Sequence, residues 1–421
     1  MSWFKHFQAF AKWLPAAALF TACQPDPVPS AAGNPVGADV VLDAPHATEV
    51  RVNIPEVIAF ERNEYPVVPD GFKVTRFAEY IPNVQNLLVT PQGEVLAVQS
   101  GLEQKDKEAI PSENQIVVLA DLDGDGLAES RRIFTKDIQG LSGMALRGDT
   151  LYFAGFNRVY KAPYKAGMNQ TTVVKSAMEL PPVSYAGSWF HDLCLSADSG
   201  SLYVGVGTNR NLITQSDEWH AESGRGVVWK LDFSPLRAQE YATGMRYPKV
   251  LALDREGSIW AGVRERSDMG DNLVPDYVTR VRPGGFYGWP WFYWGDHAQP
   301  KAPAPPDGVA RPVVPDYALG AHAGVSDLIF TDGSFSKSLG EGILVVESGS
   351  WNRSELWGYE VVFIPREGDT LPEPIPFLSG FRTGSNDIVH GIPTAIAQYT
   401  DGSILVADPG NKVIWRVSVV E

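Results

Sequence analysis

The chain has 421 residues and is acidic, with 35 Lys and Arg against 50 Asp and Glu, a formal net charge of −15 and only two Cys. These values exclude a disulfide scaffold and a basic nucleic-acid binder whose affinity would come from neutralising phosphates. At 44% hydrophobic residues the chain can bury a large core, and its 40 Gly, 32 Pro, 12 Trp, 15 Tyr and 19 Phe favour short strands and turns over helices.

The first 22 residues have the pattern of an export signal: Lys5, Lys12 and no acidic residue, followed by a short apolar run at 13–20. The run is shorter than the roughly 20 residues that span a bilayer. Segment 20–23 (FTAC) is similar to the lipobox of bacterial lipoproteins, in which the Cys thiol is acylated. We expect a signal peptide at 1–22 and a lipid on Cys23, with the protein at the outer membrane facing the periplasm. An ordinary signal peptide with a chance Cys is the alternative.

Residues 23–55 are rich in Pro, Ala, Gly and Val without a sustained periodicity, which predicts a flexible tether ahead of a folded body at 56–421. The acidity of that body argues against membrane contact beyond the lipid. The remaining Cys194 lies between two Leu residues and is predicted to be a buried thiol.

A short pattern recurs along the body: a turn with Gly or Asp, then a β-rich run ending in small residues. It occurs at 93–98, 148–154, 200–205, 257–262, 342–346 and 402–407. Equivalent positions lie 56, 51, 57, 84 and 61 residues apart, which is room for four short strands each. The pattern predicts an all-β, six-bladed β-propeller, because a β-sandwich array would repeat at roughly 100 residues.

The longest interval contains an aromatic and Pro-rich segment at 284–315. We predict that this segment is an insertion on one rim of the propeller. Loops carried by rigid blades commonly shape a site, so the mouth of the central channel is where a site is expected.

Segment 121–126 (DLDGDG) places three carboxylates at alternate positions with Gly at the sixth, as at the start of a Ca²⁺ loop. Its twelfth position is Arg132, where such a loop needs a bidentate Glu. Two interpretations remain: an acidic hairpin turn within one blade, or a weak surface Ca²⁺ site.

Three further positions are candidates for chemistry. His191, beside Asp192 and just ahead of the third repeat strand, is either a base near neutral pH or a hydrogen-bonded structural histidine. Arg246 lies in a turn before an apolar strand, and 264–271 mixes both charge signs, either as a solvated loop or around a hard cation. The body has no phosphate-binding Gly loop, Cys/His zinc spacing or nucleophile elbow in its sequence.

Taken in order, these segments resemble the soluble quinoprotein glucose/sorbosone dehydrogenase family. The most specific landmarks are 284–290 (GGFYGWP) and 349–353 (GSWNR), supported by 121–126 and by 242–246 (ATGMR). The resemblance covers nearly the whole body and is closer to the sorbosone-dehydrogenase-like branch than to the glucose enzyme. It implies a propeller that binds pyrroloquinoline quinone (PQQ) and Ca²⁺, oxidises a sugar and passes the electrons to an external acceptor.

The resemblance also implies roles for individual residues. His191 matches the general base that takes a proton from the sugar hydroxyl while hydride passes to the quinone. Arg246 matches the cation that polarises the quinone carbonyl, and Arg353 a cationic contact to the PQQ carboxylates. One loop matches the region that supplies Ca²⁺ ligands, partly through main-chain carbonyls: Glu265, Arg266 and Asp268.

Two positions differ from the family pattern. Tyr247 stands where the family usually has Asn, and Ile392 where it usually has Arg, so one cationic contact to PQQ is missing. Such a loss is expected to cost on the order of 1.5–3 kcal/mol, with Tyr247 and a protonated His390 as the substitutes. Two alternatives stay open: a noncatalytic sugar- or protein-binding propeller with a decayed cofactor site, and a Ca²⁺-dependent lactonase with a deep metal.

Overall fold

The computed structural model describes residues 35–101, 113–183, 188–337 and 339–420. The predicted signal peptide, the predicted lipid site Cys23 and the first part of the predicted tether lie outside these residues. Strands dominate the described part of the chain, whose one helix is α1 (Glu218–Ala221). None of its helical structure is long and apolar enough to cross a membrane.

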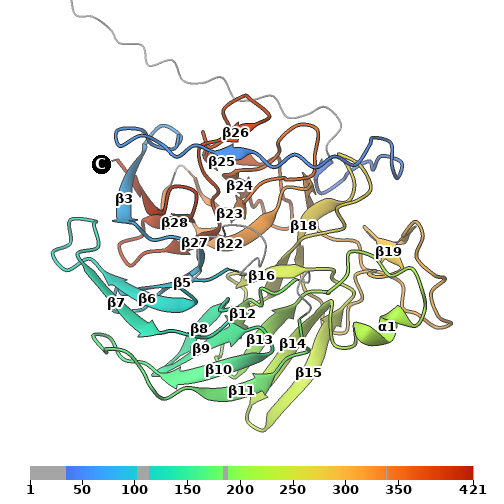
Figure 1. Cartoon of the computed structure of the whole chain (residues 1–421), viewed down its shortest axis with the longest axis horizontal. Coiled ribbons are helices and arrows are strands. Elements are labelled where there is room, and N and C mark those ends of the chain that lie inside the picture. Colours follow the sequence, from blue (N-terminus) through green and yellow to red (C-terminus); the bar gives the residue numbers. More distant parts are fainter. Residues whose placement is uncertain (1–34, 102–112, 184–187, 338, 421) are drawn as a thin grey trace, which may run out of the picture.

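Six antiparallel sheets stand around a ring, which confirms the predicted six-bladed propeller (Figure 1). Blade 1 contains β4 (Val84–Val89), β5 (Val95–Gln99), β6 (Gln115–Ala120) and β7 (Ser130–Thr135). Blade 2 contains β8 (Met144–Arg147), β9 (Thr150–Gly155), β10 (Arg158–Pro163) and β11 (Lys175–Glu179). Blade 3 contains β12 (Leu193–Leu195), β13 (Ser201–Val206), β14 (Val227–Phe233) and β15 (Leu236–Thr243).

The other three blades follow the same plan. Blade 4 contains β16 (Pro248–Leu253), β17 (Ile259–Val263), β18 (Pro275–Arg280) and β21 (Tyr317–Ala321). Blade 5 contains β22 (Val325–Asp332), β23 (Glu341–Glu347), β24 (Glu360–Pro365) and β25 (Ile375–Leu378). Blade 6 contains β27 (Ala395–Gln398), β28 (Ile404–Asp408), β29 (Val413–Val419) and β3 (Phe72–Glu79).

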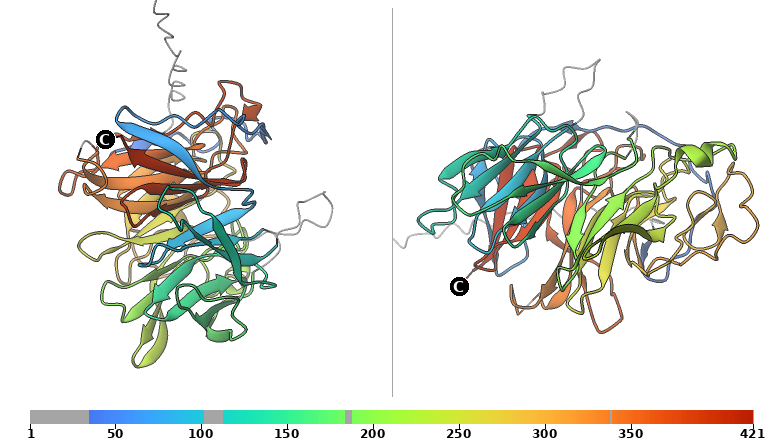
Figure 2. Two further views of the ribbon diagram at one scale, coloured as in Figure 1. Left: turned by 90° about the vertical axis from the view of Figure 1, so that its left-hand side faces the viewer. Right: turned by 90° about the horizontal axis from the view of Figure 1, so that it is seen from below.

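The first strand of each blade lies at the centre of the ring, where it contacts the first strand of the next blade. The second strand of each blade is buried along nearly its whole length because neighbouring blades cover both of its faces, whereas an outermost strand such as β11 is largely exposed. All five residues of β28 are buried, for example, and so are all six of the third strand β6. Figure 2 shows the twisted sheets in the two edge-on views.

Blade 6 is completed by a strand from the other end of the chain. β3 pairs antiparallel with β29, with Phe72 opposite Val419 and Glu79 opposite Val413. The ring is therefore closed by main-chain hydrogen bonds between two segments far apart in sequence.

Residues 35–68, here called the N-terminal strap, lie against the propeller. β1 (Val36–Gly37) adds a fifth strand to blade 4 by pairing with β21. The main-chain N–H of His46 donates to the Met269 carbonyl at 2.8 Å, and that of Asn53 to the Trp351 carbonyl at 2.8 Å. β2 (Glu56–Val57) then pairs in parallel with β26 (Ile388–Val389).

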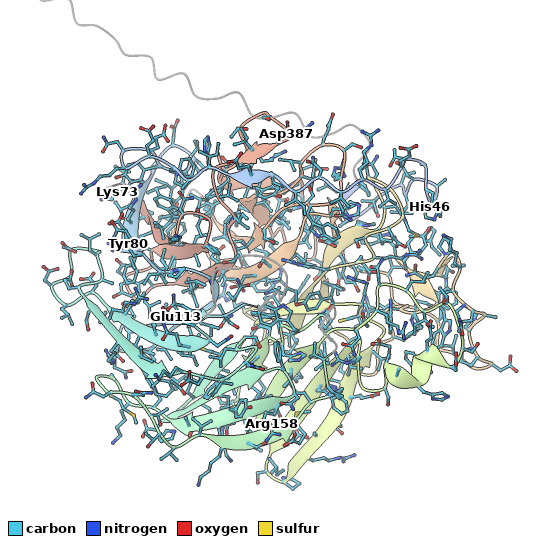
Figure 3. All side chains as sticks on the ribbon, viewed as in Figure 1. His46, Lys73, Tyr80, Glu113, Arg158 and Asp387 are labelled. Atoms are coloured by element: carbon cyan, nitrogen blue, oxygen red, sulfur yellow. The ribbon has the colours of Figure 1, made fainter. Side chains whose placement is uncertain are left out.

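The strap changes the boundary that composition suggests. The sequence predicts a tether over 23–55, but in its described part main-chain contacts at Val36, Gly37, His46 and Asn53 hold this segment against the propeller, while most of its side chains stay exposed (Figure 3 labels His46). The reason is that strand edges and loop carbonyls bind the main chain of this segment, and main-chain pairing leaves no mark on composition.

The insertion at 284–315 lies beside blades 3 and 4. It begins alongside the end of β15, where Phe286 forms a bridge with Thr243, and contains a small hairpin of β19 (Phe292–Tyr293) and β20 (His297–Ala298). Its Trp291 packs on Trp219 of α1, with ring centroids 5.2 Å apart. The insertion thus supports the loops of blade 4 from the outer side.

Candidate functional site

The candidate residues of blades 3 and 4 gather at one end of the ring. Arg246 and Tyr247 directly precede the inner strand β16, and 264–274 connects β17 to β18 at the same end of the blade. Because antiparallel strands alternate in direction, these two kinds of loop share one face. We call the resulting group the mouth cluster: Arg246, Tyr247, Arg264, Glu265 and Asp276.

Arg246 is the centre of the mouth cluster. Its Nη1 donates to the main-chain oxygens of Arg264 at 3.3 Å and of Glu265 at 2.9 Å. Its Nε is buried and makes no hydrogen bond among the described residues. Burial lowers the pKa of Arg246, and the negative charges of Glu265 and Asp276 oppose that shift. Since a guanidinium stays protonated in proteins, Arg246 presents a permanent positive charge with a free donor.

Two buried carboxylates underlie this cation. The Asp276 carboxylate accepts the main-chain N–H of Glu265 at 2.8 Å and that of Gly324 at 2.7 Å. Burial raises the pKa of Glu265 to about 7, with the charge of Arg246 opposing the rise. Burial likewise raises the pKa of Asp276. Asp276 was not predicted as a site residue, although a lone acid at the start of an apolar strand can be recognised in the sequence.

Arg264, the first residue of the mixed-charge run 264–271, supplies a second guanidinium at the mouth. Arg264 donates through Nε to the Val325 carbonyl at 2.7 Å and through Nη2 to the Gly324 carbonyl at 2.9 Å. Its main-chain N–H donates to the Tyr247 carbonyl at 2.9 Å. Its Nη2 also donates to the Ser348 hydroxyl at 2.8 Å, so the Arg264 guanidinium joins blade 4 to blade 5. Arg264 directly follows β17, and this position at the end of a strand is the feature of the sequence that could have identified it.

His191 lies deeper than the mouth cluster. Its side chain is fully buried, with Nδ1 3.3 Å from the Gly205 carbonyl oxygen and Nε2 3.2 Å from that of Phe156. Burial lowers the pKa of His191 to about 4, so the ring is neutral at pH 7, the form that accepts a proton. A neutral imidazole has one N–H and can donate to only one of these two carbonyls.

Tyr247 connects His191 to the mouth cluster. Its hydroxyl accepts the main-chain N–H of Phe190 at 3.3 Å. Burial raises the pKa of Tyr247 to about 12, so the phenol is neutral. The structure thus brings His191, Arg246, Tyr247 and Glu265 together within adjoining loops of blades 3 and 4.

Arg266 and Asp268, predicted in the Ca²⁺-binding loop, form an ion pair with each other. Arg266 is 1% exposed and also donates to the Gln299 side chain at 3.0 Å and the Pro300 carbonyl at 3.1 Å. Burial acts to raise the pKa of Asp268, but the hydrogen bond and charge of Arg266 hold it below its usual range. In this arrangement the pair fastens the insertion to the loop of blade 4.

Arg353 and His390 stand apart from the mouth cluster. Arg353 is 2% exposed and donates to the Asp271 carbonyl and, at 3.0 Å, to the Asn272 side chain. His390 is 2.9 Å, at Nδ1, from the carbonyl oxygen of Ile58 in the strap. In the described part of the chain no hydrogen bond links either side chain to the mouth cluster, and their assignment to cofactor binding stays a prediction.

A buried ionic group joins the inner strands beneath the mouth. Lys249 donates to the Ser326 carbonyl at 3.3 Å and lies 3.1 Å from the Phe190 ring centroid. The Asp192 carboxylate accepts the Leu251 N–H at 2.8 Å, and the Asp327 carboxylate accepts the Ile396 N–H at 2.9 Å. Burial lowers the pKa of Lys249 and raises those of both acids. The group ties blades 3 to 6 together around the channel.

The acidic segment at 121–126 forms the hairpin turn between β6 and β7, on the face opposite the mouth. Asp121 accepts the main-chain N–H groups of Gly124 at 2.7 Å and of Gly126 at 2.9 Å, as an acidic turn requires. One oxygen from each of four carboxylates lies within 4.8 Å of the others: Asp121, Asp123, Asp125 and Glu129. Glu129, not the twelfth residue Arg132, is thus the fourth acid.

The mouth cluster fits PQQ better than it fits Ca²⁺. PQQ is a planar polycarboxylate, and the free donor of Arg246 beside the cation of Arg264 is suited to such an anion. A Ca²⁺ ion instead needs six to eight oxygens at about 2.3–2.6 Å. The main-chain oxygens of Arg264 and Glu265 are already bonded to Arg246, and Asp276 to main-chain N–H groups.

Comparison with known proteins supports the fold. No family model matches the chain. An uncharacterised protein of Borreliella burgdorferi is 22% identical over 373 residues, which are 83% of this chain and 90% of the relative.

The holo form of the PQQ domain of pyranose dehydrogenase from Coprinopsis cinerea has a TM-score of 0.66 at 17% identity, over 87% of this chain and 100% of the neighbour. A calcium structure of a carbohydrate-active enzyme of Trichoderma reesei has a TM-score of 0.68 at 17% identity, over 89% and 100%. The PQQ-bound aldose sugar dehydrogenase of Streptomyces coelicolor has a TM-score of 0.56 at 16% identity, over 84% and 100%. At such identities the likeness establishes a shared propeller fold.

Proposed function

We propose that this protein oxidises a sugar, an aldose or a sorbosone-like compound, with PQQ held at the mouth cluster and electrons passed to an external acceptor. The observation that carries the proposal is the pair of guanidinium groups of Arg246 and Arg264, one of which keeps a buried, unpartnered donor. Neighbours that share the propeller include proteins described as PQQ-bound or as PQQ domains acting on sugars.

When bound, PQQ supplies the acceptor for the hydride removed from the sugar carbon. Arg246 and Arg264 are the residues that would hold the carboxylates, and their positive charges would stabilise negative charge at the mouth. Tyr247 contributes a neutral phenol beside them. These residues come from loops of blade 4, which the insertion and the Arg266–Asp268 ion pair brace from outside.

His191 is proposed as the proton acceptor. It is neutral at pH 7, as this role requires, but its Nε2 is occupied by contact with the Phe156 carbonyl. For the ring to take the sugar proton at Nε2, the turn at 156–157 between β9 and β10 has to shift when substrate binds. The proton acceptor is therefore set below the mouth and reached by a local movement of blade 2.

The sealed position of His191 also favours one competing function, a noncatalytic propeller that binds a sugar or a protein at its mouth. A lactonase with a deep metal is less favoured, because the buried acids Asp192 and Asp327 are already bonded to main-chain N–H groups and face Lys249. We further propose that Cys23 carries a lipid that holds the protein at the periplasmic side of the outer membrane.

The test is reconstitution of the purified chain with PQQ, followed by dye reduction with a panel of aldoses. We expect reduction with at least one sugar and a fall of at least about a hundredfold in His191→Ala. The matched control is His220→Ala, which changes an exposed histidine of α1 and should keep the wild-type rate. Quinone binding without dye reduction for any sugar would instead support the noncatalytic propeller.

A further inference from the structure

The Nη1 atom of Arg246 occupies the position between two carbonyl oxygens that a divalent cation would need. Arg246 Nη1 lies 3.3 Å from the Arg264 carbonyl oxygen and 2.9 Å from the Glu265 carbonyl oxygen. Adjacent carbonyls that converge on one point are typical ligands of a hard cation such as Ca²⁺. Here they converge on a guanidinium that the chain itself provides.

The surrounding charges favour the guanidinium over a metal ion. Arg246 already places a positive charge at this point, and a divalent ion beside it would be repelled. The acids nearest to such an ion already accept hydrogen bonds from the main chain. Asp276 accepts three main-chain N–H groups, and one carboxylate oxygen of Glu265 accepts the Arg266 N–H at 3.2 Å.

The burial of two neighbouring acids also favours Arg246 over a metal ion. Glu265 is 6% exposed and Asp276 is 4% exposed, so their negative charge is not compensated by water. Arg246 opposes the charge of Glu265 and Arg264 that of Asp276, so the chain itself provides one cation for each acid. Displacing the Arg246 side chain to admit Ca²⁺ would take its Nη1 from both carbonyls, and a buried guanidinium that loses its acceptors is costly.

We infer that Arg246 is the resident cation of this site, standing in place of a divalent metal, so that the anionic ligand at the mouth binds without Ca²⁺. The identity of the ligand as PQQ rests on the proposed function, whereas the exclusion of the metal does not. The ligand class is a planar polycarboxylate, held by the free Nε of Arg246 and by Arg264.

The first experiment measures PQQ binding to the purified full chain by quenching of tryptophan fluorescence, in excess EDTA and in excess Ca²⁺. We expect the same Kd in both buffers, within about twofold. A Kd more than about tenfold weaker in EDTA, restored by Ca²⁺, would overturn the inference. Failure to bind PQQ in either buffer would count against the proposed function, and the second experiment then decides the inference alone.

The second experiment measures metal binding directly, with Tb³⁺ luminescence as a probe for Ca²⁺ sites. The acidic turn on the opposite face is first neutralised by Asp121→Asn, Asp123→Asn and Asp125→Asn, because its four clustered acids would also bind the probe. In this background we expect no saturable site, and a new saturable site when Arg246→Met is added. Met has a similar length and no charge.

Two outcomes would overturn the inference here. One is a saturable site of one ion per chain while Arg246 is intact. The other is no gain of a site in a folded Arg246→Met variant, which would mean that something other than Arg246 keeps the cation out. Circular dichroism of each variant establishes that it is folded, and Arg246→Gln serves as a second substitution if Arg246→Met does not fold.

Discussion

The mouths of blade 4 and blade 6 are built from the same kind of loop, yet they differ in how their buried polar groups are paired. At blade 6, Asp408 is fully buried and accepts the Ile392 N–H at 2.9 Å and the Trp415 indole N–H at 3.0 Å. Asn411 accepts the Phe60 N–H at 2.8 Å and donates to the His390 carbonyl at 2.7 Å. The strap and the blade together satisfy this network.

At blades 4 and 5 the pairing is incomplete. Buried donors without a hydrogen bond in the described residues include Arg246 Nε, Arg353 Nε, the Tyr277 hydroxyl and Trp289 Nε1, and none of this kind occurs in blade 6. An unpaired buried donor is costly in a finished structure, so it marks a place where a ligand or water belongs. The difference makes blade 6 a structural closure and, under the proposed function, blade 4 the binding face.

The largest effect is expected for Arg246→Met, which tests whether blade 4 is the binding face. We expect the rate of dye reduction to fall by about 10²–10³-fold, because the variant lacks the cation that stabilises charge on the cofactor. Steady-state assays with the reconstituted protein measure the fall. Arg311→Met, at a side chain 88% exposed in the insertion, is the control and should keep the rate. An active Arg246→Met variant would remove blade 4 from the site.

Asp408→Ala tests whether the buried polar network of blade 6 contributes to stability and not to binding. Removing this carboxylate leaves the indole of Trp415 and the N–H of Ile392 unpaired, so the free energy of unfolding should fall by on the order of 3 kcal/mol. Denaturant unfolding measures the fall, and PQQ affinity should not change. Asp369→Ala, at a side chain 95% exposed, is the matched control. Weaker quinone binding in a folded Asp408→Ala protein would show that blade 6 contributes to the site.

Glu265→Gln tests the buried acid by its pH dependence. The folded-state pKa of Glu265 is about 7, above its ordinary 4.5, so between these values the folded protein holds a proton that the unfolded chain releases. Its contribution to stability is therefore fully present below pH 4.5 and is lost as the pH rises towards 7. We expect the variant to be less pH-sensitive than the wild type across this window.

Denaturant unfolding at a series of pH values measures that difference, with exposed Glu240→Gln as the control. Equal pH slopes for wild type and Glu265→Gln would mean that Glu265 titrates as an ordinary solvated acid. The charge balance drawn for the mouth cluster would then be incorrect.

Arg264→Lys tests the role of the Arg264 guanidinium at the mouth without removing its positive charge. Lys keeps the positive charge but loses the planar fork that bonds to the Val325 and Gly324 carbonyls. We expect PQQ to bind about tenfold more weakly, measured by fluorescence quenching. An unchanged Kd would indicate that Arg264 serves only to join blades 4 and 5.

The smallest effect is expected for His390→Ala. The His390 ring contacts the strap, with Nδ1 near the Ile58 carbonyl and the ring 5.1 Å from that of Phe60. We expect a loss of stability below about 1 kcal/mol and no change in quinone affinity. A clear loss of affinity would support the role that the family resemblance implies for His390.

The repeat pattern was sufficient to predict the architecture, because each blade needs a buried apolar strand and a turn at a regular interval. It also placed His191, Arg246 and Glu265 correctly at strand ends, and in a propeller such ends share one face. The contacts of these residues could not be predicted. That Arg246 bonds to the carbonyls of Arg264 and Glu265 depends on how two loops meet, which side-chain identity does not encode.

The packing of the strap was missed for a related reason. His46 and Asn53 are held through main-chain N–H groups, which any residue except Pro provides. Composition therefore describes residues 36–55 as it would describe a free linker. Asp276 was overlooked because it is one charge in an apolar context, and Arg264 was named only within the mixed-charge run 264–271. The fold shows that the two face the same point.

The pairing of β3 with β29 has a consequence for how the protein is made. β3 is synthesised early and β29 at the end, so the growing chain carries an edge strand without its partner until almost the whole body exists. Contacts so distant in sequence form slowly. A ribosome-bound chain therefore holds an open ring until β29 is made, and it is at this stage that chaperone protection matters most.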